Sequence, residues 1–118
     1  MLKCLDLSSN LIRNAGAIAL SEALTLNVSL AAINLKYNEI FSEGAKALAK
    51  SLKSNSTLKL VDIMSNPIGD AGATALVESL ESSLSLMSVN VWYSSFMEAE
   101  SWFWHHIQSI GCHGSLIF

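Results

Sequence analysis

Hydrophobic and polar residues alternate over short stretches of the chain, and each stretch is followed by a helical spacing of apolar residues. In the first stretch, Leu5 and Leu7 would point to one side of an extended segment, and Cys4, Asp6 and Ser8 to the other. The same alternation returns 28 residues later and once more after another 28. Each stretch therefore predicts a short strand with one buried face.

Apolar residues at spacings of three and four follow each predicted strand, which predicts an amphipathic helix. The three stripes are Ala17, Leu20, Leu24; Ala45, Leu48, Leu52; and Ala73, Leu76, Leu80. A good capping residue stands before each stripe, namely Asn14, Ser42 and Asp70. We expect these three side chains to accept hydrogen bonds from the first amides of their own helices.

Three further residue types recur at the same period of 28 residues, which is typical of a stacked repeat architecture. The columns are Asn10, Asn38, Asn66; Gly16, Gly44, Gly72; and Leu2, Leu30, Leu58, Leu86. We expect the asparagines to face inward and bond to the backbone of the turns, forming a ladder. We expect the glycines to let each helix approach its own strand closely. Asn27 and Asn55 are expected to end their helices in a left-handed conformation.

One repeat has too few apolar side chains to offset the entropy of ordering its backbone, so neighbouring repeats must complete its core. Stacking would place the strands side by side in a parallel sheet. Because helices are wider than strands, the stack would curve. The sequence thus predicts an α/β solenoid, a horseshoe segment with parallel strands on the concave face and helices on the convex face.

The pattern L-x-x-L-x-L-x-x-N-x-I, followed by G-A-x-A-L, resembles the leucine-rich repeat family and, within it, the ribonuclease-inhibitor-like branch. That branch includes the arrays of NOD-like receptors, Ran GTPase-activating protein and tropomodulin-like actin regulators. The resemblance covers residues 1–95, as three full repeats of 28 residues and the start of a fourth. It implies binding of another macromolecule along the horseshoe.

Outward-pointing residues of the predicted strands and turns would line the concave face, and we take them as candidate partner-binding residues. They are Asp6, Ser8, Asn34, Lys36, Tyr37, Asp62, Met64, Asn90 and Trp92. Exposed aromatic residues and methionine are enriched at interfaces, so Tyr37, Met64, Trp92 and Tyr93 are a candidate hot spot. The alternative is that Trp92 and Tyr93 cover the end of the array.

Composition narrows the class of partner. The formal net charge is −3 and 14% of the residues are charged, without the basic excess that favours nucleic acid or an anionic membrane. No stretch approaches the roughly 18 consecutive apolar residues of a membrane span. The first repeat follows Met1 directly, without a secretory signal, and Cys4 and Cys112 are too few for a disulfide framework. We therefore expect a cytoplasmic protein that binds a protein partner.

The repeat pattern breaks after Val91, where Ser94 replaces the expected asparagine and Glu100 the expected glycine. Residues 96–118 are then either a divergent C-terminal cap or a truncated or altered ending. Four residues of this segment can bind metals, His105, His106, Cys112 and His113. They lack the paired spacing of a zinc site, so we expect no metal and no cofactor.

Two hypotheses for function remain. The first is a non-catalytic protein-binding scaffold, part of a longer array or self-associating because the core of its first repeat is open to solvent. The alternative is a GTPase-activating regulator of the Ran-directed type. It would act through Arg13, the single arginine, which lies in the loop after the first strand.

Overall fold

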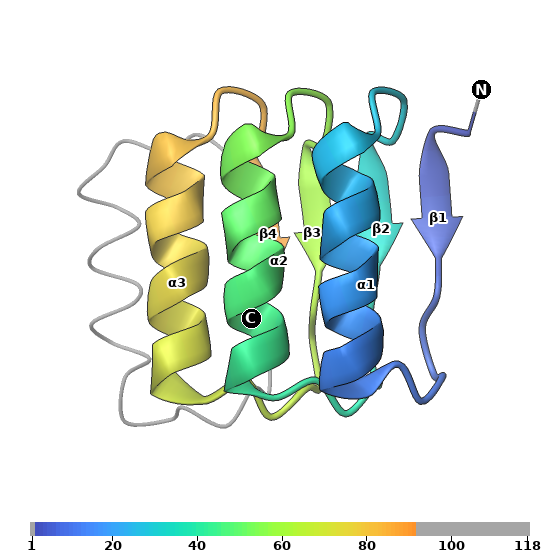
Figure 1. Cartoon of the computed structure of the whole chain (residues 1–118), viewed down its shortest axis with the longest axis vertical. Coiled ribbons are helices and arrows are strands. Elements are labelled where there is room, and N and C mark those ends of the chain that lie inside the picture. The colour runs from blue at the N-terminus through green and yellow to red at the C-terminus, as the bar shows by residue number, and fades with distance from the viewer. Residues whose placement is uncertain (1, 92–118) are drawn as a thin grey trace.

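The computed structural model describes residues 2–91, in which strands and helices alternate strictly (Figure 1). The strands are β1 (Cys4–Asp6), β2 (Ala32–Asn34), β3 (Leu60–Asp62) and β4 (Ser88–Asn90). The helices are α1 (Arg13–Leu26), α2 (Ser42–Ser54) and α3 (Gly69–Ser82). Met1 and residues 92–118 lie outside the described part of the chain, as do the predictions made for them.

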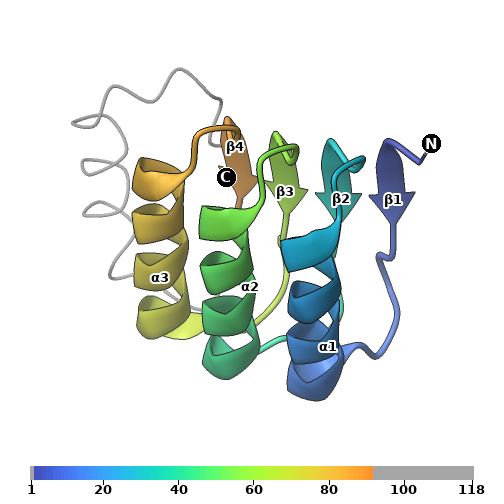
Figure 2. The ribbon, with the colours of Figure 1, turned by 45° about the horizontal axis from the view of Figure 1, so that its top comes forward.

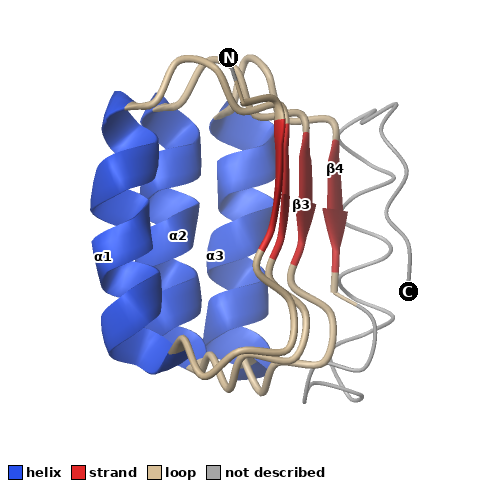
Figure 3. Cartoon of the chain, turned by 90° about the vertical axis from the view of Figure 1, so that its right-hand side faces the viewer, coloured by secondary structure: helices blue, strands red, loops and turns tan. Residues whose placement is uncertain are grey.

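The strands form one parallel sheet in the order β1-β2-β3-β4, and each residue pairs with the one 28 positions further along. Leu5, for example, lies beside Ile33, which lies beside Val61. The helices stand side by side in a second layer that covers one face of the sheet (Figures 2 and 3). The predicted α/β repeat solenoid is confirmed. We call the sheet face that points away from the helices the concave face.

The core lies between the sheet and the helices. It consists of residues that the strand alternation and the helical spacing predicted to be buried. Ile33 and Val61 from the strands are each 2% exposed, and Leu48 and Leu76 from the helices are each 1% exposed. Helix stripes and strand alternation therefore meet in one continuous apolar layer, as predicted.

The predicted asparagine ladder is present. The Nδ2 atom of Asn38 donates to the carbonyl oxygens of Leu7, Leu35 and Lys36 at 2.9, 3.1 and 3.0 Å. Its Oδ1 atom accepts from the backbone amide of Asn10 at 3.0 Å. Asn66 repeats these contacts one unit later. Both side chains are fully buried, so they satisfy backbone groups that water cannot reach.

The capping prediction is wrong, because none of the three N-cap residues makes a side-chain cap and the predicted residues lie inside the helices. Asn14 is the second residue of α1, and its side chain lies beside α2. There its Oδ1 atom accepts from the amides of Phe41 and Gly44 at 2.9 and 3.1 Å. Asn14 thus caps the helix of the next repeat.

The prediction of left-handed helix ends is also wrong. Asn27 and Asn55 have extended backbones, with φ near −75° and ψ of 136°. Their Oδ1 atoms accept from the amides two and three residues later, which folds the chain toward the next strand. Asn55 also donates to the carbonyls of Leu24 and Asn27 at 2.8 and 3.1 Å. A second asparagine link therefore joins neighbouring repeats.

The glycines allow close packing, but against the neighbouring helix rather than their own strand. A Cβ on Gly44 would lie 2.8 Å from Asn14 Oδ1 and 3.0 Å from Ala17 Cβ, both in α1. It would also lie 2.7 Å from Ile40 Cγ2 in the loop before α2. The missing side chain therefore sets the distance between helices.

Candidate protein-binding surface

Three candidate residues on the concave face use one side-chain oxygen to shape the turn that follows each strand. The Oδ1 atoms of Asp6, Asn34 and Asp62 accept from the amide two residues later at 2.9, 3.0 and 3.1 Å. Asn90, in the fourth strand, is only 9% exposed. These side chains thus shape the turns, and their exposure to solvent decreases from the first repeat to the fourth.

Charges of both signs lie next to one another on this face. Lys36 Nζ lies 3.5 Å from Asp62 Oδ2, in a partly buried ion pair between two repeats. Hydrogen bonds from the side chain and the backbone of Ser8, followed by the charge of Lys36, hold the pKa of Asp6 below its ordinary value of 3.8. Asp6 is therefore ionised at neutral pH and presents a fixed negative charge.

Tyr37 has an unusual backbone for an aromatic residue. Its φ is 55°, and Ser9 and Ser65 at the same place in the neighbouring repeats have 57° and 59°. Left-handed backbone is strained for a bulky side chain, yet the Tyr37 amide is fixed by a bond to the Met64 carbonyl at 3.3 Å. The Tyr37 side chain is 56% exposed. The repeat thus holds an aromatic side chain in solvent at a position where its neighbours carry serine.

Sequence reasoning left out two apolar residues that the structure places near these candidates. Leu60 is 39% exposed and lines a depression of about 250 Å³ with Asp6, Asn34 and Asp62 on the concave face. Leu11 is 66% exposed and lines a depression of about 650 Å³ with Ser9, Asn10 and Tyr37. The signal for Leu60 was available, because a leucine stands in an outward column that elsewhere holds cysteine, alanine and serine.

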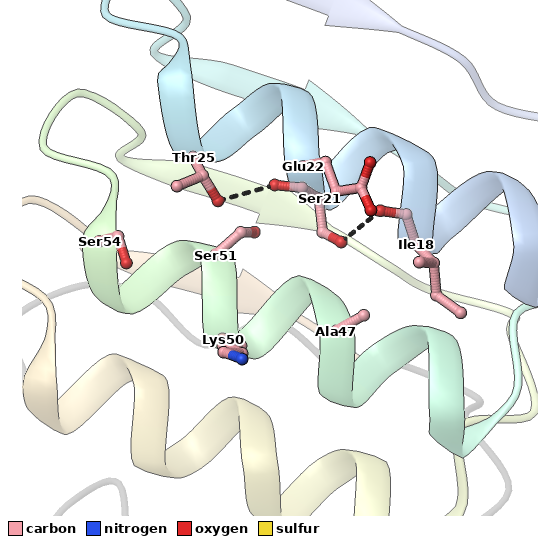
Figure 4. Close-up of a pocket in the computed structure, with 8 residues that line it drawn as sticks. All are labelled: Ile18, Ser21, Glu22, Thr25, Ala47, Lys50, Ser51 and Ser54. Carbon is pink, nitrogen blue, oxygen red and sulfur yellow. Dashed lines mark hydrogen bonds between the residues drawn. The ribbon is translucent and has the colours of Figure 1, made fainter.

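A further hollow lies between helices α1 and α2, on the opposite side of the molecule from the concave face (Figure 4). It measures about 340 Å³, and its lining includes Ser21, Thr25 and Lys50. The two hydroxyls donate to carbonyls of their own helix, Ser21 to Ile18 at 2.7 Å and Thr25 to Ser21 at 2.9 Å. Both hydroxyl hydrogens are therefore used within α1.

Arg13, the residue of the alternative hypothesis, is the first residue of α1 rather than a loop residue as predicted, and it forms an ion pair with the neighbouring repeat. Its Nε atom lies 3.1 Å from Glu39 Oε2, and the two side chains are 62% and 56% exposed. Exposed pairs of this kind contribute little to stability. The guanidinium is nevertheless engaged by a carboxylate of the neighbouring repeat.

Residues 2–91 contain no group of three or more histidine, cysteine, aspartate or glutamate side chains that could hold a metal ion. None of the helices within this range has the length and apolar character required to cross a membrane. The histidines, Cys112, Trp92 and Tyr93 lie outside it.

Comparison with known proteins agrees with this architecture. The family model described as leucine-rich repeat matches residues 1–21, 25–49 and 54–77, more than half of the chain. The chain therefore belongs to the leucine-rich repeat family.

A solved structure titled leiomodin-1 actin-binding site 2 is similar in fold, with a TM-score of 0.76 and 19% sequence identity. The match covers 95% of this chain and 66% of the leiomodin chain. No curated protein matches the sequence.

Proposed function

We propose that this chain is a non-catalytic protein-binding module that recognises a protein partner through its concave face and the loops beside it. The observation that carries the proposal is Tyr37, an aromatic side chain 56% exposed on a backbone with φ of 55°. Exposed aromatic residues are enriched where proteins bind one another, and strained backbone is often found at functional positions.

Other residues of the concave face support this reading. Lys36 and Asp62 form an ion pair, Met64 is half-buried, and Leu60 is 39% exposed. We call these four residues, together with Tyr37, the binding patch. Protein interfaces usually combine apolar and aromatic residues with polar groups, as this patch does. The strands beneath are fixed by the ladder and by the sheet, so binding would not require the backbone to become ordered.

We also propose that the chain belongs to the ribonuclease-inhibitor-like branch and works in the cytoplasm. The 28-residue register and a helix of 13 or 14 residues after each of the first three strands support the branch. The free, exposed thiol of Cys4 is compatible with a reducing compartment.

Photo-cross-linking tests the binding patch. A photoreactive amino acid replaces Lys36 in one protein and Lys50, on the exposed side of α2, in a control protein. Purified actin is the first probe, because the similar leiomodin structure is titled as an actin-binding site, and a cell extract is the second. Cross-linking from position 36 should exceed that from position 50, and unlabelled wild-type protein should compete for it.

The decisive competitor is Tyr37→Asn. Asparagine tolerates left-handed backbone, whereas alanine would keep the strain, so this variant should fold normally. It should compete at least about tenfold less well than wild-type protein, the loss expected for a hot-spot residue. Equal competition by a folded Tyr37→Asn protein, or equal cross-linking from position 50, would reject the proposal.

A GTP-hydrolysis assay with small GTPases tests the alternative hypothesis, a GTPase-activating regulator of the Ran-directed type. The protein-binding proposal predicts no stimulation. Stimulation that is lost in Arg13→Ala would replace it with the catalytic reading.

A further inference from the structure

The loop between β2 and α2 follows a different path from the loops of the neighbouring repeats. Each of the three loops ends with a second left-handed residue, which is the first helical residue in the first and third repeats, Arg13 and Gly69. In the second repeat it is Glu39, two positions earlier in the repeat. Phe41, at the place of Arg13 and Gly69, has extended backbone instead, with φ of −98° and ψ of −169°. We call residues 35–41 the second loop.

This path displays two aromatic side chains. Tyr37 is 56% exposed and Phe41 is 52% exposed, whereas the third repeat has Ser65 and Gly69 at these positions. Described repeats lie on both sides of the second loop, so its aromatic residues belong to the interior of the array. Exposed aromatic side chains are enriched where proteins bind one another.

Side chains of the neighbouring repeats hold the second loop in place. The Oδ1 atom of Asn66, a residue only 1% exposed, accepts from the amides of Asn38 and Ile40 at 2.9 and 3.0 Å. From the other side, the Oδ1 atom of Asn14 accepts from the amide of Phe41 at 2.9 Å. The strained backbone is thus fixed without a partner, which lowers the entropic cost of binding one.

The side of the molecule where the strands end is acidic. It comprises the last residue of each strand, the loop that follows and the first two residues of each helix, along the lower edge of Figure 3. Five acidic and two basic residues lie there, namely Asp6, Glu39, Glu43, Asp62, Asp70, Arg13 and Lys36. The rest of residues 2–91 has five lysines and three glutamates. The net charge is therefore −3 on this side and +2 over the remainder of the described part.

The basic residues of this side are not free to balance its acidic ones. Both form ion pairs with carboxylates of the neighbouring repeat. Three further carboxylates make no ion pair within residues 2–91, namely Asp6, Glu43 and Asp70. A partner that supplied cations would balance these charges, whereas an acidic partner would be repelled.

We infer that the second loop binds a basic segment of a protein partner, with an apolar side chain of that segment packed against Tyr37 and Phe41. The inference rests on the proposed function and adds the chemistry of the partner. Lysine or arginine side chains of the segment would lie beside Glu43, which is exposed in the first turn of α2 next to the loop.

Nitrogen-15 NMR titration of the full chain with short synthetic peptides tests this inference. The first peptide consists of lysine and glycine around one central leucine. The second has serine in place of the leucine, and the third has glutamate in place of every lysine. The first peptide should shift the amide resonances of residues 35–43 and bind more tightly than the other two. Added sodium chloride should weaken its binding, because salt screens exposed charges.

Two pairs of variants locate the site. Glu43→Lys should weaken binding of the first peptide by at least about fivefold, because it repels the peptide's lysines. Glu78→Lys makes the same change in net charge in the second half of α3, where Glu78 is exposed, and should bind like wild-type protein. Phe41→Ser should weaken binding by at least about tenfold. Phe41 is the N-cap residue of α2 and serine is favoured there, so this variant should keep its circular dichroism spectrum.

Leu84→Ser is the matched control for Phe41→Ser, because Leu84 is fully exposed in the loop after α3. It should bind the first peptide like wild-type protein. No binding of the first peptide, equal binding of the serine or glutamate peptide, or equal losses in Glu78→Lys and Leu84→Ser would each overturn the inference. Cross-linking from position 36 uses none of these peptides, so its result shows whether the proposed function fails as well.

Discussion

The side-chain oxygen of Asn38 accepts a hydrogen bond from the backbone amide of Asn10 at 3.0 Å, across a separation of 28 residues. Asn66 makes the same bond to Asn38 at 2.9 Å. Each of the second and third repeats thereby provides the acceptor for a turn of the repeat before it. Register between repeats is fixed by this bond as well as by the parallel strands.

Replacing Asn38 by alanine should destabilise the protein. The change removes three donated bonds and one accepted bond from a fully buried site. Unpaired buried backbone groups should lower the free energy of unfolding by on the order of 1–3 kcal/mol. Urea denaturation measures the difference. Asn10→Ala is the control, because Asn10 is exposed and, within residues 2–91, its side chain bonds only to Leu7 and Ser8, so its effect should be clearly smaller.

Gly44→Ala should destabilise the protein even though alanine is the better helix former. The added methyl group would lie within 3.0 Å of atoms of Asn14, Ala17 and Ile40, so the helices must separate. Overpacking of this kind costs about 1–3 kcal/mol, more than the roughly 1 kcal/mol gained in helix propensity. In Gly16→Ala, only the half-buried Ile12 is close, and that protein should melt at a higher temperature than Gly44→Ala.

Asn55→Ser distinguishes the local hydrogen bonds of Asn55 from the bonds that Asn55 donates to the preceding repeat. Serine can still accept from the following amides, as Ser83 does from Ser85 and Leu86 at 3.2 and 2.9 Å. It cannot donate to the carbonyls of Leu24 and Asn27. We expect a loss of about 1 kcal/mol in the free energy of unfolding, and a larger loss in Asn55→Ala. Asn27→Ser, which keeps every bond that the first repeat uses, should be nearly neutral in the same assay.

The pKa of Asp6 should respond to Ser8→Ala. Hydrogen bonds from Ser8 are the main cause of its lowered pKa, so removing the hydroxyl should raise the pKa toward 3.8. Because the pKa is lower in the folded protein, this carboxylate stabilises the fold above pH 3.8, and the contribution disappears as the pH falls through the folded value. A carbon-13 NMR titration measures the pKa. Lys36→Met should shift it less, since the charge of Lys36 contributes less than the bonds from Ser8.

The local hydrophobic pattern and its repetition along the chain predicted most of the fold. Alternation around Leu5 and Leu7 located a strand, the spacing of Leu20 and Leu24 located a helix, and the 28-residue period stacked both in order. The Asn38 prediction held because a buried turn needs a side chain that both donates and accepts, and asparagine at that spacing can do so. These properties depend on one repeat and its copies, which the sequence shows directly.

Only the tertiary structure decided where side chains act across repeats. Asn14 and Gly44 sit at positions that suggest a role in their own helix, yet each acts on the neighbouring one, because the distance between helices is not encoded in the spacing of any one of them. The exposure of Tyr37 and Leu60 likewise depends on what lies beside each residue in space. Sequence by itself determined the repeating unit, because the periods that mark a strand and a helix are local properties of the chain. Stacking decided which surfaces of that unit meet another repeat and which remain available to a partner.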